Sequence, residues 1–209
     1  MNRCIIVGAG EFFPGCRIHK NPGDLLIAAD GGYQHLEKMN LVPDLLVADF
    51  DSLTVSAPAE VPVMRFQSEK DDTDMGIAIA EGIRRGYTEF LLYGGTGGRQ
   101  DHTFANYQAL IHLARAGKRG YLIAESTLTT AIADSCLAFH PLPSGFVSIF
   151  AVDNECKGVS IQGLKYELDG VSLTNDYPLG VSNELIGKPA SVSVGQGTLL
   201  IFCPIEAVL

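Results

Sequence analysis

Five short apolar segments limit what the first half of this chain can fold into. Each is apolar along its whole length instead of at alternate positions, as in strands that are buried on both faces of a sheet. Four of the five end directly in Gly or Asp, and helical patterns separate most of them. They span residues 4–7, 25–29, 45–48, 90–93 and 120–124. These segments predict a parallel sheet covered by helices, in an α/β domain.

Three segments between these strands have helical character. They span residues 33–39, 72–85 and 103–116. In the middle one, Met75, Ile79 and Ile83 recur every fourth residue, which gives one apolar stripe facing a core. Gly86 and Gly117 follow the two longer helices and can end them, because glycine tolerates the left-handed conformation of a helix C-terminus.

The character of the chain changes after about residue 126. Helical periodicity disappears, Gly and Pro become frequent, and short runs alternate or carry β-branched residues. These runs span residues 146–150, 159–161, 191–194 and 198–202. We therefore expect an N-terminal parallel-sheet α/β nucleotide-binding domain over residues 1–130, followed by a C-terminal all-β sandwich domain over residues 131–209.

Composition and charge exclude several classes of function. The net charge of −9 argues against a nucleic-acid partner, because phosphate backbones need a basic surface. No apolar stretch approaches about 18 residues, so we expect no membrane helix. The cysteines number five, an odd count without C-x-x-C spacing, which favours a reducing compartment. Without a convincing signal peptide, the expected location is the cytoplasm.

The chemistry is expected where the strands end, because ligands of open parallel sheets bind beyond the carboxyl ends of the strands. Gly8, Asp30, Asp49 and Gly94 mark four of these ends, and a nucleotide should lie there. The dinucleotide fingerprint G-x-G-x-x-G fails at Phe13, which disfavours a dinucleotide oxidoreductase.

Two acidic residues at one strand end predict a cation site. Asp49 and Asp51 stand two apart in an extended segment, so both side chains point to one face. A magnesium ion between them would offset their repulsion. The alternative is an ordinary strand-to-loop turn, in which Asp is common.

A second acidic run covers residues 69–74. Asp71 and Asp74 stand three apart at a helix start, so both can lie on one side. Acidic residues also favour a first helical turn without any ligand. Both explanations can hold together, with Thr73 or Asp72 capping the helix and Asp74 facing a ligand.

The segment 94–102 combines glycines with Arg, Asp and His between a strand and a helix. Glycine lets backbone amides approach a phosphate, and a helix N-terminus favours anions. Arg99 adds a fork of hydrogen-bond donors, and His102 is a candidate for orienting a ligand. The alternative is a plain glycine turn, since the P-loop pattern is absent.

Taken in order, these segments resemble the bacterial type of the thiamine pyrophosphokinase family. The matching stretches cover residues 29–32, 43–52, 69–74, 94–102, 163–166 and 181–184. Together they span nearly the whole chain. Two departures are Ala48, where relatives often have Gly, and Tyr166, where some have Trp. Tyrosine still offers an aromatic face to the cationic ring of thiamine.

The resemblance implies an ATP-binding domain, a thiamine-binding domain and a magnesium-dependent transfer of diphosphate from ATP to thiamine. It also implies a homodimer with active sites at the subunit interface. By matching motifs, the catalytic residues would be Asp49, Asp51, Asp71, Asp74 and Asp101, with Asp49, Asp51 and Asp74 holding the metal. ATP would contact Asp30, Gly31, Lys70, Gly94, Gly95, Thr96, Arg99 and His102. Thiamine would contact Tyr166, Ser182 and Asn183, from the partner subunit.

Two other functions fit parts of the pattern. A related enzyme could move diphosphate to another alcohol, such as a pterin, with the same glycine and aspartate cleft. A non-catalytic nucleotide sensor would use the β domain to bind a partner. The thiamine-contacting residues of the second domain distinguish a thiamine enzyme from the first alternative. Turnover of ATP distinguishes an enzyme from the sensor.

Overall fold

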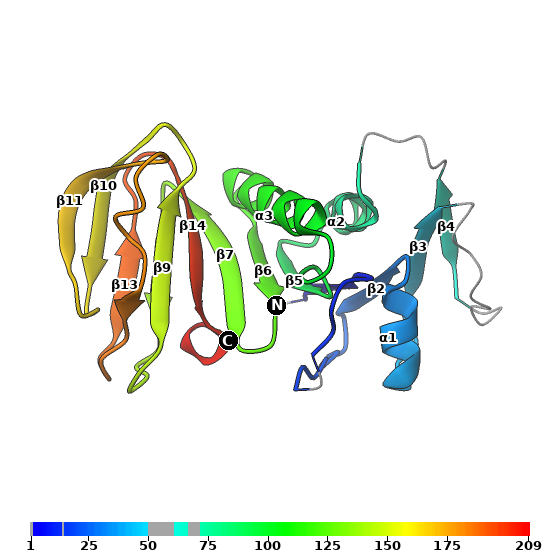
Figure 1. Ribbon diagram of the computed structural model, residues 1–209. Coiled ribbons are helices and arrows are strands. Elements are labelled where there is room, and N and C mark those ends of the chain that lie inside the picture. The colour runs from blue at the N-terminus through cyan, green and yellow to red at the C-terminus, as the bar shows by residue number, and fades with distance from the viewer. Residues whose placement is uncertain (1, 14, 50–60, 67–71) are drawn as a thin grey trace. The chain divides into compact units, whose positions relative to one another are not determined.

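The computed structural model describes residues 2–13, 15–49, 61–66 and 72–209, and only the backbone of Asp49 and Phe66. These residues form two compact units (Figure 1). The first contains Met1–Ala109 and Leu122–Glu125, and the second contains Leu110–Tyr121 and Ser126–Leu209. Within the described ranges, no helix is long and apolar enough to cross a membrane.

The sheet of the first unit is parallel, as the continuous apolar runs predict. Its strands are β1 (Cys4–Val7), β2 (Leu25–Ala29), β3 (Leu45–Asp49), β4 (Val63–Phe66) and β5 (Glu89–Tyr93). They pair in the order β5-β1-β2-β3-β4, all parallel. Every residue of β1 and β2 is buried, because helices cover the sheet on both faces.

Helices α1 (Gly32–Lys38) and α2 (Asp74–Arg84) lie on opposite faces of this sheet (Figure 1). The α2 helix begins at a capped end, where the Gly76 amide donates to the Thr73 hydroxyl at 3.1 Å. It ends before Gly86, whose φ of 88° is the left-handed conformation that glycine tolerates. Helix α3 (Gln100–Arg115) follows β5 and begins three residues before the predicted start at Thr103.

The strand order reverses direction between β1 and β5. From β1 the chain adds β2, β3 and β4 on one side, and then returns to place β5 on the other side. The loops that follow two such neighbouring strands diverge, which opens a crevice at their carboxyl ends. The first unit therefore has one topologically favoured place for a ligand.

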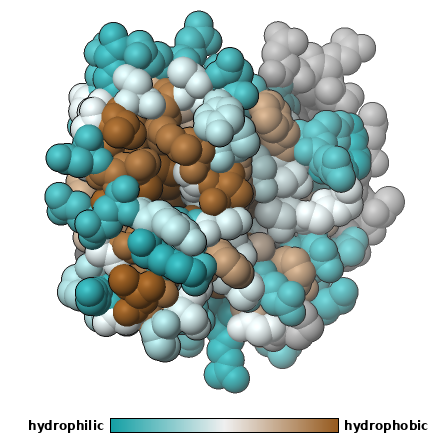
Figure 2. Space-filling model, turned by 60° about the vertical axis from the view of Figure 1, so that its left-hand side comes forward, coloured by the Kyte–Doolittle hydropathy of each residue, from teal (hydrophilic) through white to brown (hydrophobic). Residues whose placement is uncertain are grey.

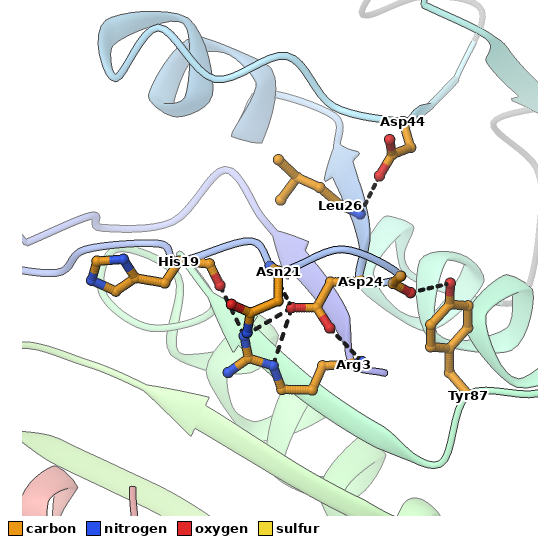
Figure 3. A network of polar contacts seen from close by, with 8 residues as sticks. Arg3, His19, Asn21, Asp24, Leu26, Asp44 and Tyr87 are labelled. Atoms are coloured by element: carbon orange, nitrogen blue, oxygen red, sulfur yellow. Dashed lines mark hydrogen bonds and ion pairs between the residues drawn. The ribbon is translucent and has the colours of Figure 1, made fainter. Parts of the chain in front are cut away.

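A polar network fastens the opposite, amino edge of the sheet (Figure 3). Asp24 is 7% exposed, and its carboxylate accepts from the Arg3 amide at 2.8 Å and the Arg3 guanidinium at 2.8 Å. Burial raises the pKa of Asp24, but hydrogen bonds from Arg3 and Asn21 more than offset it and leave that pKa below its usual range. These bonds fix the loop that returns from β1 into β2.

The second unit contains two antiparallel sheets, which confirms the predicted all-β sandwich. Within this unit the strands pair in the orders β12-β9-β14-β7 and β11-β10-β13-β8. Their strands are β7 (Thr127–Ala133), β8 (Cys136–Phe139), β9 (Phe146–Ala151), β10 (Glu155–Gln162), β11 (Leu168–Thr174), β12 (Asn183–Glu184), β13 (Ala190–Ser193) and β14 (Thr198–Pro204). Strand β6 (Arg119–Ile123) has residues in both units, and a short 3-10 helix, Ile205–Ala207, follows β14.

Alternation along β9 shows how this unit forms its core. Val147, Ile149 and Ala151 are buried, whereas Phe146 and Phe150 point outward and are exposed. A strand with one buried face shows this period of two, unlike the continuously buried strands of the first unit. The outward face of β9 is apolar as well, which is unusual for a face in contact with water.

Candidate functional site

A cavity of about 490 Å³ lies in the first unit where the strand order reverses. Its walls come from the segments that follow β1, β2 and β5 and from the starts of α2 and α3. Of the residues expected to bind ATP or a metal, the following line it: Asp30, Asp74, Gly94, Gly95, Thr96, Arg99 and His102. The cavity therefore lies at the predicted carboxyl ends of the strands.

Two loops form one wall by pairing with each other. The Gly10 amide donates to the Gly94 carbonyl, and the Glu11 amide donates to the Thr96 carbonyl, each at 2.8 Å. A Cβ on Gly10 would lie 2.6 Å from both of these carbonyl oxygens. Gly10 is thus required by the close approach of two backbones, a role separate from phosphate contact.

The loop after β5 presents backbone to the cavity. Gly94, Gly97 and Gly98 have φ values of 61°, 78° and 60°, which side chains rarely adopt. The Thr96 hydroxyl oxygen is buried and has no hydrogen-bond partner among the described residues. A buried polar atom without a partner is costly, so a ligand in the cavity would relieve it.

Two aspartates contribute negative charge to the same cavity. Asp74 is the first residue of α2 and follows the capping residue Thr73, as predicted. Asp30 directly follows β2 with a φ of 48°, and its amide donates to the Val47 carbonyl at 2.8 Å. Asp adopts this left-handed conformation more readily than most residues do. The conformation sets the direction in which the Asp30 side chain leaves the backbone.

Arg99 and Asp101 form an ion pair at the rim. The guanidinium Nη2 lies 2.5 Å from the Asp101 Oδ2, with the two side chains 72% and 64% exposed. The hydrogen bond from Arg99 holds the pKa of Asp101 below its usual range. Arg99 lines the cavity and Asp101 does not, so the pair can open to release Arg99 toward an anion.

Asn106 is a cavity residue that sequence reasoning missed. Its side chain is 6% exposed and its Nδ2 donates to the Gly95 carbonyl at 2.7 Å. The contact ties the glycine loop to α3. The signal was present in the sequence, because Asn106 stands on the helical stripe of the buried Leu110 and Leu113, where a polar residue needs a partner.

The remaining expected residues fall into two groups. Asp51, Lys70 and Asp71 lie outside the described residues, and so does the side chain of Asp49, whose backbone ends β3. Gly31 is described but does not line the cavity. It packs close to Ala9, and a Cβ added to Gly31 would lie 3.0 Å from the Ala9 Cβ. Within the described part of the chain, no three His, Cys, Asp or Glu side chains cluster as metal ligands do.

The three residues expected to contact thiamine lie together in the second unit. Tyr166 is 59% exposed, and Ser182 is exposed with a φ of 60°. Asn183 is only 5% exposed, and its side chain bonds to the Tyr166 main chain at both ends. Two of the three are therefore available to a ligand, and the third supports them.

Comparisons with known families match both parts of the chain. A model described as "Thiamin pyrophosphokinase, catalytic domain" matches residues 19–122. A second, described as "Thiamin pyrophosphokinase, vitamin B1 binding domain", matches residues 140–199. The two models describe successive domains of one family, in the order expected.

Individual relatives match over nearly the full length. "Thiamine pyrophosphokinase" of Bacillus subtilis (strain 168) is 24% identical over 210 residues, which cover 93% of this chain and 94% of the relative. The crystal structure of thiamine pyrophosphokinase from Bacillus subtilis has a TM-score of 0.86 at 23% identity, over 98% of this chain and 99% of that one. The enzyme from Geobacillus thermodenitrificans has a TM-score of 0.83 at 26% identity, over 97% of each chain.

Proposed function

The chain belongs to the thiamine pyrophosphokinase family, and we propose that it transfers a diphosphate group from ATP to the hydroxyl of thiamine, giving thiamine diphosphate and AMP. The observation that carries this proposal is the cavity at the strand reversal, lined by a glycine loop, an arginine and two aspartates. We assign ATP binding to the domain of residues 1–130 and thiamine binding to residues 131–209.

The glycine loop is suited to the phosphates of ATP. Its positive-φ glycines leave backbone amides accessible, and α3 begins directly after it, so the positive end of a helix dipole favours an anion there. The Thr96 hydroxyl, which has no partner among the described residues, can donate to a phosphate oxygen. Arg99 and Lys70 add positive charge to the same group, His102 offers a ring nitrogen to a ligand, and Asp30 and Gly31 shape the side that follows β2.

Magnesium fits the acidic residues of this site. Asp49, Asp51 and Asp74 would hold the ion, because carboxylate and phosphate oxygens are the ligands that it prefers. Asp74 lines the cavity and Asp49 ends the neighbouring strand β3, which supports this assignment. The bound ion would neutralise charge on the phosphates during transfer.

The proposed reaction is an in-line displacement at phosphorus. The thiamine hydroxyl oxygen attacks the β-phosphorus of ATP, the bond from that phosphorus to the oxygen of the α-phosphate breaks, and AMP leaves in line. Asp71 or Asp74 accepts the hydroxyl proton. Arg99, released from Asp101, stabilises the negative charge that develops on the transferred group.

Thiamine is positively charged, and we propose that its ring stacks on Tyr166 with Ser182 beside it. The exposed Tyr166 ring and the acidic chain, with its net charge of −9, both favour a cation. We further propose that these residues act in a homodimer, with each active site at the subunit interface.

An apolar face on the second unit supports the dimer. Exposed apolar side chains gather there (Figure 2). They come from β9 and from the segment that runs beside it: Phe146, Phe150, Tyr177, Leu179, Val181 and Ile186. Sedimentation of the wild type should give a dimer, and Phe146→Ser should weaken it. A monomeric wild type at micromolar concentration would contradict this part of the proposal.

We also propose a cytoplasmic location. All five cysteines are free, which agrees with a reducing compartment. Fractionation of cells that express the tagged protein tests this, and recovery in a secreted or membrane fraction would contradict it.

The activity is tested by incubating the protein with ATP and magnesium, with and without thiamine, and measuring AMP and thiamine diphosphate. We expect both products in equal amounts, only with thiamine, and their loss with a magnesium chelator. Asp51→Asn and Asp74→Asn should abolish both, whereas Asp176→Asn, at an exposed position in the second unit, should not. Bound ATP without AMP would favour a sensor, and transfer to a pterin alcohol would favour the related enzyme.

A further inference from the structure

The Asn183 side chain forms its hydrogen bonds with the protein itself, at the position where the proposed function needs the aromatic ring of Tyr166. Its Nδ2 donates to the Tyr166 carbonyl at 2.6 Å, and its Oδ1 accepts from the Tyr166 amide at 3.0 Å. The Oδ1 also accepts from the Glu184 amide at 2.9 Å. A side chain that is 5% exposed and bonded at both polar atoms has little left to offer a ligand.

These hydrogen bonds have the pattern of two paired β-strands. One carboxamide satisfies both the donor and the acceptor of a single residue, as a neighbouring strand would. Around it, the Lys165 amide donates to the Glu184 carbonyl at 3.0 Å, and Leu164 forms an isolated bridge with Leu185. The segment that carries Tyr166 is thereby joined to β12, although it belongs to no named strand.

The Tyr166 ring, by contrast, is mostly free of the protein. It is 59% exposed, and the Lys165 ammonium lies 5.5 Å from its centroid. That ammonium lies over the ring and is also bound to the Glu184 carboxylate at 2.7 Å, which offsets its charge. An exposed ring can take several rotamers, and a fixed main chain limits the positions that these rotamers can reach.

Ser182, the residue before Asn183, is held in the same way. Its φ of 60° is a left-handed conformation, and its amide donates to the Ser148 hydroxyl at 3.0 Å. A non-glycine residue keeps such a conformation only when its surroundings fix it. The pairing of Asn183 with Val147 on β9 provides that support.

We propose that Asn183 is a positioning residue, which fixes the main chain of Tyr166 so that its ring stays beside Ser182 to receive the cationic ring of thiamine. This deepens the proposed function and rests on it. Asn183 itself does not need to touch the substrate, which differs from the role that the family resemblance implies.

A tryptophan reporter tests this directly, because the chain contains no tryptophan. In Tyr166→Trp, the single indole reports on its own motion through fluorescence anisotropy and on thiamine through quenching. We compare Asn183→Ala with Asn175→Ala in this background, since Asn175 is exposed and its side chain bonds to that of Asn154 at 3.4 Å. If Asn183→Ala does not fold, Asn183→Ser replaces it.

We expect Asn183→Ala to lower the anisotropy without ligand and to raise the KM for thiamine roughly tenfold, with the KM for ATP unchanged. Asn175→Ala should change neither. A higher KM with unchanged anisotropy would mean that Asn183 contacts thiamine directly, and would overturn the proposal. Unchanged anisotropy and KM would overturn it too. A protein that makes no thiamine diphosphate at all would instead refute the proposed function, while the anisotropy result would still decide whether Asn183 fixes the position of residue 166.

Discussion

Gly10→Ala should damage the cavity wall although it adds only one methyl group. The new Cβ would lie 2.6 Å from the Gly94 and Thr96 carbonyl oxygens, which are backbone atoms and cannot swing away. The two loops would have to separate, which strains the hydrogen bonds of 2.8 Å at Gly10 and Glu11. Each bond contributes about 1 kcal/mol, and overpacking adds about 1–3 kcal/mol. Loss of both bonds together with overpacking would cost roughly 3–5 kcal/mol.

Gly15→Ala is the matched control, because it lies in the same loop with no atom within 4 Å of its Cβ. Neither glycine has a left-handed φ, so backbone strain does not distinguish them. Gly15→Ala should be neutral or stabilise by about 0.5 kcal/mol, since it restricts the unfolded chain. The assays are urea unfolding and the KM for ATP, which only Gly10→Ala should raise. Equal stability of the two variants would refute the close approach of these loops.

Two further predictions concern buried polar groups. Asn106→Ala leaves the Gly95 carbonyl without its donor, so we expect a loss of about 1–3 kcal/mol in urea unfolding and a higher KM for ATP; an unchanged KM would mean that Asn106 does not shape the loop. The Glu81 carboxylate accepts from Arg84 at 2.7 Å and Arg85 at 2.6 Å, and these bonds, chiefly that from Arg84, lower its pKa from 4.5 to about 2. A lowered pKa stabilises the folded state above pH 4.5, and this stabilisation is lost as the pH falls through about 2. The difference in unfolding free energy between the wild type and Glu81→Gln should therefore shrink from pH 6 toward pH 2, and a constant difference would contradict this origin.

Burial explains only part of which strands the sequence revealed, because β7 (Thr127–Ala133) is buried at five of its seven positions and was missed. Strands β1 and β2 are buried at every position and were predicted at the residues where they occur. Strand β11 was missed because only one of its seven residues, Leu173, is buried, and β12 because it has two residues. Strand β4 was missed as well, since its described side chains are all at least partly exposed and include the charged Arg65.

The site could be predicted where residue types that are uncommon in buried strands gather at the strand ends. Clusters of Gly and Asp at strand ends marked the cavity, because the carboxyl ends of parallel strands meet at one edge. Glu11 lines it through tertiary contacts that no local pattern encodes, whereas Asn106 could have been found from its place on a buried helical stripe. The role of Gly10 was also hidden, since close packing and phosphate binding favour the same residue.

The fate of a label on the β-phosphate of ATP tests the central claim most directly. If the hydroxyl of thiamine attacks the β-phosphorus, ATP labelled at the β-phosphate should give labelled thiamine diphosphate and unlabelled AMP. Label from the γ-phosphate should reach the same product in equal amount, because the diphosphate moves as one unit. A β-label that remains with ADP, or thiamine monophosphate as the product, would contradict the account.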